Sequence, residues 1–84
     1  MQTRDKRVII VTMKAVYLLR EDTMHEDELG SYVSYGITCK SELGEEHVPD
    51  ISTDRELVEN AVERFNRYGL SPLHFHDAIE EEIE

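Results

Sequence analysis

The sequence contains one cysteine, no tryptophan and only four glycines among its 84 residues. The single Cys39 has no partner for a disulfide within the chain, and no second cysteine is present to complete a zinc site. The glycines are isolated from one another, so the chain lacks the glycine-rich loop that holds a phosphate group. Disulfide-stabilised scaffolds, cysteine zinc sites and nucleotide-binding loops are therefore excluded.

Long apolar runs are also absent. A membrane-spanning helix needs about 20 predominantly apolar residues, whereas residues 8–11 form a short apolar run that Lys14 soon follows. The same run is too short for the apolar region of a signal peptide. A lone free cysteine is typical of a reducing compartment. The sequence therefore predicts a cytoplasmic protein that does not enter the membrane.

Basic residues are scarce, since nine lysines and arginines stand against 19 acidic residues and give a formal net charge of -10. The charge is uneven: residues 1–20 hold five basic residues and one acidic residue, while residues 21–84 hold four basic and 18 acidic residues. An acidic body repels the phosphate backbone of nucleic acids, so direct binding to DNA or RNA is not expected. A basic protein partner suits this charge.

The last third of the chain predicts a pair of helices. Over residues 53–68, apolar residues recur with the spacing of one helical face, and Thr53 and Glu56 have the arrangement of a capping box. Gly69 follows, a residue that favours the left-handed conformation common at helix ends. The first helix is therefore expected over residues 53–68.

A second helix start follows directly. Ser71 can cap free amide groups, and Pro72 suits the first helical position, where a missing N–H loses no hydrogen bond. This helix is expected over residues 72–83. Because only residues 69–71 link the two helices, they must lie side by side and share a core.

Strands are predicted over residues 8–20 and 31–48. From Ile9 to Leu19 every second residue is apolar, and the β-branched and aromatic content favours a strand. The alternation is clearest over residues 31–40, which place these apolar side chains on one face: Val33, Tyr35, Ile37 and Cys39.

The second strand region contains two further signals. Gly36 inside a strand indicates a bulge or the close approach of another backbone. A turn near Leu43 and Gly44 lets residues 45–48 return as a short edge strand, which Pro49 is expected to end because it cannot donate a ladder hydrogen bond.

The remaining segments are rich in charged residues and show neither the helical nor the strand periodicity of apolar residues. Residues 1–7 are expected to form a flexible arm, and residues 21–30, with five carboxylates, a solvent-exposed acidic loop. A calcium-binding loop beginning at Asp22 would need an oxygen ligand where Met24 stands and a glycine where Asp27 stands. The acidic segment therefore does not match a calcium site.

These elements predict one α+β domain over residues 1–84. A small antiparallel sheet of two long strands and one short strand should pack on a C-terminal two-helix hairpin. The inner faces of the strands are expected to share a dry core with these helical side chains: Leu57, Val62, Phe65 and Ile79.

One cluster has the chemistry of metal ligands, namely His74, His76 and Asp77. On a helix, His74 and Asp77 share one face while His76 shares another with Glu80, so three ligands do not converge. Cys39 falls on an inner face, where a thiol behaves as an apolar group. The sequence therefore predicts no metal, no cofactor and no enzymatic activity; a metal-assisted enzyme using the cluster is the least favoured hypothesis.

The sheet face opposite the helices is expected to be more apolar than contact with water favours. It carries Val16, Leu18 and Tyr32, which we predict to be partner-binding residues, together with Val8 and Ile10. A domain of this size also has a limited core, which favours association. The partner is expected to be another protein or a second copy of the chain in a homodimer.

Four short motifs support a family assignment: Ser-Tyr-Gly-Ile at residues 34–37, Val-Pro-Asp-Ile-Ser at 48–52, Ser-Pro-Leu-His at 71–74 and Asp-Ala-Ile-Glu at 77–80. With them the chain resembles, over residues 32–83, a family of short bacterial proteins classed as a domain of unknown function. The resemblance implies a bacterial, cytoplasmic protein and no particular reaction.

Two functions fit these features. The first is a protein–protein interaction or regulatory module, which the half-apolar sheet face and the lack of a catalytic motif favour. The alternative is an acidic mimic of nucleic acid that inhibits a basic DNA- or RNA-binding protein, which the acidity of residues 21–84 favours.

Overall fold

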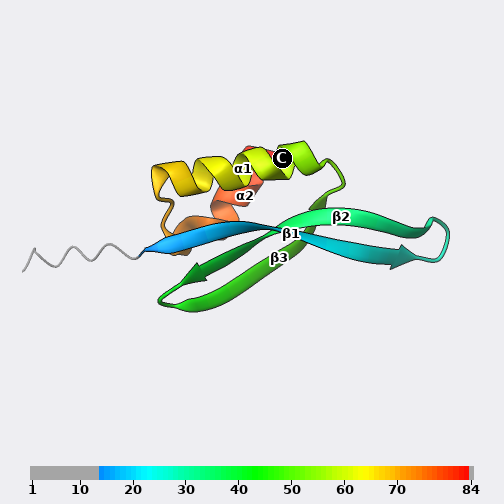
Figure 1. Ribbon diagram of the computed structural model, residues 1–84, viewed down its shortest axis with the longest axis horizontal. Coiled ribbons are helices and arrows are strands. Elements are labelled where there is room, and N and C mark those ends of the chain that lie inside the picture. The colour runs from blue at the N-terminus through cyan, green and yellow to red at the C-terminus, as the bar shows by residue number, and fades with distance from the viewer. Residues whose placement is uncertain (1–13, 84) are drawn as a thin grey trace, which may run out of the picture.

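The computed structural model of the protein describes residues 14–83. The predicted arm of residues 1–7 and the predicted strand over residues 8–13 lie outside the described residues. The described chain forms β1 (Ala15–Glu26), β2 (Gly30–Ser41), β3 (Gly44–Ser52), α1 (Arg55–Tyr68), a short 3-10 helix η2 (Pro72–His74) and α2 (Phe75–Ile83). The strands form one antiparallel sheet in the order β1-β2-β3, and the helices lie on one side of it (Figure 1). The predicted α+β fold is confirmed.

β1 and β2 form a long hairpin. They pair without interruption from Ala15 opposite Ser41 to Glu26 opposite Gly30, so the turn comprises residues 27–29 alone. The acidic loop predicted for residues 21–30 is therefore wrong. This part of the hairpin projects beyond the helices, and its carboxylates stay in water while the main chain pairs (Figure 1). Aspartate and glutamate are disfavoured in strands, but here the cross-strand pairing of the main chain outweighs that preference.

β3 is longer than the edge strand predicted for residues 45–48, because it continues past Pro49 to Ser52. The register places Ile37 opposite Val48 but Tyr35 opposite Ser52, so β3 bulges opposite Gly36. A Cβ atom on Gly36 would lie 2.1 Å from the Val48 carbonyl oxygen. The close approach of another backbone, predicted at this glycine, is confirmed.

The helix boundaries follow from their caps. α1 begins at Arg55, and its cap is Asp54, whose side chain accepts a hydrogen bond from the Leu57 N–H at 3.4 Å; the predicted Thr53 cap is wrong. α1 ends at Tyr68, and Gly69, which caps it, has a left-handed φ of 64°. Ser71 accepts from the Leu73 N–H at 3.3 Å, as a cap should, but the first turn after it is the 3-10 helix.

The core lies between the sheet and the two α-helices. Odd-numbered side chains from the helix-covered part of β1 and β2 point into it, and its buried members are Tyr17, Ile37, Cys39, Val58, Ala61, Phe65 and Phe75. Val62 and Ile79, which the sequence places in this core, pack against it while partly buried. Val33 was also expected there, but it is 41% exposed and lies opposite Thr23, in the half of the hairpin towards its turn. No helix within residues 14–83 is long and apolar enough to cross a membrane.

Candidate functional site

One face of the sheet is covered by helices, and the opposite face, which we call the outer face, is not covered by any element of residues 14–83 (Figure 1). Because side chains alternate along a strand, the even-numbered residues of β1 and β2 form it. The pairing adds two residues of β3, since Glu45 lies opposite Lys40 and His47 lies opposite Thr38. The outer face therefore spans all three strands.

The apolar part of the outer face lies near the start of β1. Val16 and Leu18 are 53% and 41% exposed, although both are large apolar side chains. Tyr32 belongs to the same face but lies opposite Met24, towards the hairpin turn, and is partly buried. The three predicted partner-binding residues thus share a face without forming one continuous patch.

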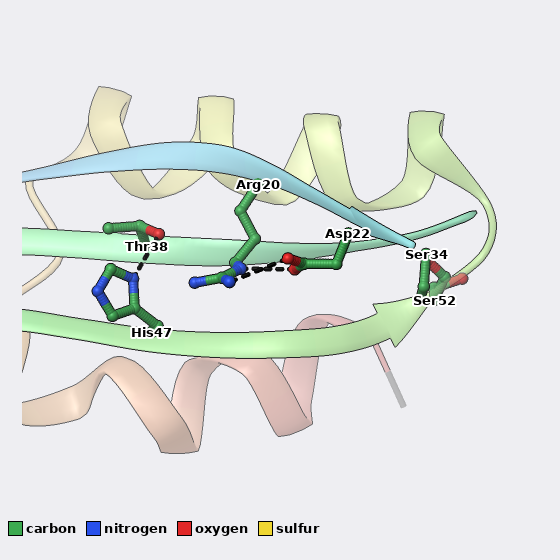
Figure 2. A network of polar contacts seen from close by, with 6 residues as sticks. All are labelled: Arg20, Asp22, Ser34, Thr38, His47 and Ser52. Atoms are coloured by element: carbon green, nitrogen blue, oxygen red, sulfur yellow. Dashed lines mark hydrogen bonds and ion pairs between the residues drawn. The ribbon is translucent and has the colours of Figure 1, made fainter. Parts of the chain in front are cut away.

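An ion pair separates these two apolar regions. Arg20 and Asp22 are neighbours on the outer face of β1, and Arg20 Nε lies 2.6 Å from Asp22 Oδ2 while its Nη2 lies 3.0 Å from Oδ1 (Figure 2). The bidentate hydrogen bond from Arg20 lowers the pKa of Asp22 and raises that of Arg20 itself. The middle of the outer face is therefore charged but internally paired.

Hydroxyl groups of β2 are fixed to β3 on the same face. Thr38 Oγ1 lies 2.9 Å from His47 Nδ1, and Ser34 donates to the Ser52 carbonyl oxygen at 3.2 Å (Figure 2). His47 Nε2 also lies 3.4 Å from a carboxylate oxygen of Glu45. These cross-strand contacts hold the outer face in one arrangement, which suits a surface recognised by shape.

The sequence alone did not predict the polar contacts of the outer face. Arg20 and Asp22 are opposite charges two residues apart, a signal that can be read only once residues 21–26 are recognised as a strand. The contact of Thr38 with His47 depends on the register between β2 and β3. That register follows from the two-residue turn at 42–43, which the sequence located only approximately.

The structure does not bring together His74, His76 and Asp77, the three residues with the chemistry of metal ligands. His76 Nε2 lies 2.6 Å from Glu46 Oε2 of β3, while His74 and Asp77 are exposed. Within residues 14–83, no group of three or more histidine, cysteine, aspartate or glutamate side chains is placed to hold a metal ion. Cys39 is 2% exposed, and burial raises the pKa of its thiol.

A cleft of about 290 Å³ opens between α1 and α2. Its walls are mainly apolar, and at one side Arg64 forms an ion pair with Glu82. It contains no nucleophile beside a base, and it is lined by Arg64, Phe65, Tyr68, Leu70, Ala78, Glu81 and Glu82. We therefore favour the outer face over this cleft as the candidate functional site, because the outer face combines exposed apolar side chains with an ordered polar centre.

The chain matches no curated protein and no solved structure. Residues 3–84 match a protein-family model described as "Family of unknown function (DUF6514)". This range covers nearly the whole sequence and includes every element of the fold. The predicted membership of a family of unknown function is confirmed at that level, and the chain belongs to the family of unknown function DUF6514.

Proposed function

We propose that this protein is a small interaction module that binds another protein through the outer face of its sheet. The observation that carries the proposal is the exposure of Val16 and Leu18, at 53% and 41%, on a sheet face that no described element covers. Exposed apolar side chains beside paired polar groups are typical of a protein-binding surface.

The charged groups of the chain also favour binding over catalysis. Arg20 is held by Asp22, and His76 is held by Glu46, so these groups are committed to one another on the surface. Such pairs contribute recognition and register at an interface. A general base poised for proton transfer would need a free site beside it for a reacting atom.

The chemistry of the partner follows from what surrounds Val16 and Leu18. Lys40, opposite Val16, lies 3.7 Å from Glu45, and the rest of the chain is strongly acidic. We therefore expect the partner to present an apolar patch to Val16 and Leu18, with basic residues beside it.

The proposal is tested by capturing partners with the full chain from a lysate of the organism that encodes it, then measuring binding of the purified partner by calorimetry. Replacing Val16 and Leu18 together by serine should weaken that binding at least about tenfold, because apolar anchors near the centre of an interface dominate its affinity. The matched control is Leu73→Ser, since Leu73 is 68% exposed on η2, away from the outer face.

Equal binding by the double variant and by Leu73→Ser would contradict the proposal. Thermal unfolding of both variants shows whether the fold is intact, and only small changes are expected at such exposed positions. The acidic nucleic-acid mimic would instead be favoured if the captured partner binds DNA, the module competes with DNA for that partner, and salt releases the module from it.

A further inference from the structure

Among residues 14–83, no strand pairs with the second edge of β1, and Asn66 of α1 closes part of that edge. The Tyr17 N–H donates to Asn66 Oδ1, and Asn66 Nδ2 donates to the Tyr17 carbonyl oxygen, both at 2.8 Å. The N–H and C=O groups of Tyr17 therefore point away from β2. Asn66 occupies the position that a neighbouring strand would take.

No element of the described chain pairs with the rest of this edge. In an antiparallel ladder, the N–H and C=O groups of successive residues point to alternate sides of the strand. The N–H and C=O groups that point away from β2, as those of Tyr17 do, therefore include those of Leu19, Glu21, Thr23 and His25. Within residues 14–83 their N–H and C=O groups make no hydrogen bond. The edge of β3, by contrast, is interrupted by Pro49 and the bulge. An unprotected edge is a template for another strand.

The charge beside the open edge selects its occupant. Residues 21–34 contain five carboxylates and no lysine or arginine, and the carboxylates are Glu21, Asp22, Glu26, Asp27 and Glu28. A second copy of β1 itself would bring like charges together. A strand that binds here should carry positive charge, because electrostatic complementarity disfavours an acidic one.

The chain itself contains a segment with these properties. Residues 4–7 hold three basic residues and one acidic residue, and residues 8–12 have the sequence Val-Ile-Ile-Val-Thr, which strongly favours a strand. We propose that the open edge of β1 receives residues 4–13 of a second copy of this chain as an added strand, in a reciprocal homodimer.

A second copy fits better than a fold-back of the same chain. Residues 4–13 directly precede β1, so a tight fold-back would first run beside Ala15 and Tyr17, where Asn66 already bonds the edge. A segment from another molecule can reach the edge from Leu19 onward without passing Asn66. Two-fold symmetry then lets each copy donate one strand and accept one.

The main test is the molar mass of the full chain in solution, measured by light scattering over a range of concentrations. The full chain should form a dimer, and Thr23→Pro should raise the dimer dissociation constant at least about tenfold. Proline at Thr23 removes only an N–H on the open edge and leaves the β1–β2 ladder intact. The control Thr23→Val keeps that N–H, and the dimer should persist.

Mixing two complementary variants distinguishes strand exchange between two copies from other dimer contacts. A variant in which Arg4, Lys6 and Arg7 are all glutamate should not donate its strand, and Thr23→Pro should not accept one. Each variant alone should be monomeric, while an equal mixture should form a heterodimer with one donated strand. A monomeric full chain, a dimer indifferent to Thr23→Pro, or a mixture that stays monomeric would overturn the proposal. Because none of these residues is Val16 or Leu18, the outcome is independent of the partner proposed for the outer face.

Discussion

Tyr17 joins the sheet to both α-helices. Its ring is 1% exposed and packs against Phe65 and Phe75, with 5.5 Å between ring centroids in each case. Its hydroxyl donates to the Leu70 carbonyl oxygen at 2.7 Å, in the link between the helices. Burial raises the pKa of the phenol, so the group stays neutral and keeps donating. One side chain thus sets the distance between three elements.

Gly36 is a residue at which even the small substitution to alanine should strongly lower the free energy of unfolding. A Cβ atom there would meet the Val48 carbonyl oxygen at 2.1 Å and the Pro49 Cα atom at 2.8 Å, and backbone atoms cannot simply rotate away. We expect Gly36→Ala to lower the free energy of unfolding by about 3 kcal/mol or more. Denaturant unfolding followed by circular dichroism measures this.

The control for Gly36→Ala is Gly69→Ala. Gly69 has a φ of 64° but open space around the added Cβ atom, so it tests conformational strain without a clash, at about 1 kcal/mol. Similar losses in the two variants would mean that the bulge of β3 does not press on Gly36.

At the scale of elements, the link between the two helices and the helix-covered face of the strands could be predicted from the sequence. Gly69 and Ser71 mark the ends of the helices through local hydrogen bonds, which neighbouring residues alone determine. Alternation likewise placed Tyr17 and Ile37 on the helix-covered face.

Features that depend on distant partners could not be predicted in this way. The density of carboxylates predicted a loop over residues that belong to β1, which continues to Glu26. The strand forms there because pairing with β2 satisfies the main-chain hydrogen bonds of that segment. The outer-face contacts of Thr38 with His47 and of Ser34 with Ser52 need the register across the bulge. The Asn66 contact with Tyr17 joins residues 49 positions apart.

The start of α1 gives a direct test at this scale, because Thr53 and Asp54 are both suitable caps. The Asp54 side chain accepts from the Leu57 N–H, so Asp54→Ala should lower the free energy of unfolding by about 1 kcal/mol. Thr53→Ala should change it by less than about 0.5 kcal/mol. Denaturant unfolding of both variants decides the point. The reverse order would place the cap at Thr53.

For the molecule as a whole, burial is concentrated at one end of the sheet. The core residues of β1 and β2 lie beneath the helices, while residues 21–26 and 30–33 form a two-stranded ribbon that projects beyond them (Figure 1). A two-stranded ribbon without a core is only marginally stable by itself. The free energy of opening should therefore differ between the two ends.

Cys39 provides a probe of the stable end. Its side chain is 2% exposed, and burial raises the pKa of its thiol, so both access and thiolate formation should require the core to open. We expect a thiol reagent to modify Cys39 at a rate that tracks the fraction of globally unfolded chain as denaturant is added. Amide hydrogen exchange in the projecting ribbon should be faster and nearly independent of denaturant, because local opening exposes little surface.

The matched control places the only cysteine at an exposed position, by combining Leu43→Cys with Cys39→Ala. Leu43 is 62% exposed in the β2–β3 turn, so this thiol should react as fast in the folded protein as in the unfolded one. If native Cys39 reacted at the rate of the Leu43 cysteine, the region beneath the helices would be opening locally. The uneven distribution of stability would then be contradicted. Slow modification of Cys39 together with fast exchange in the ribbon would instead assign the rigid part of the molecule to the helix-covered sheet and the adaptable part to the open edge.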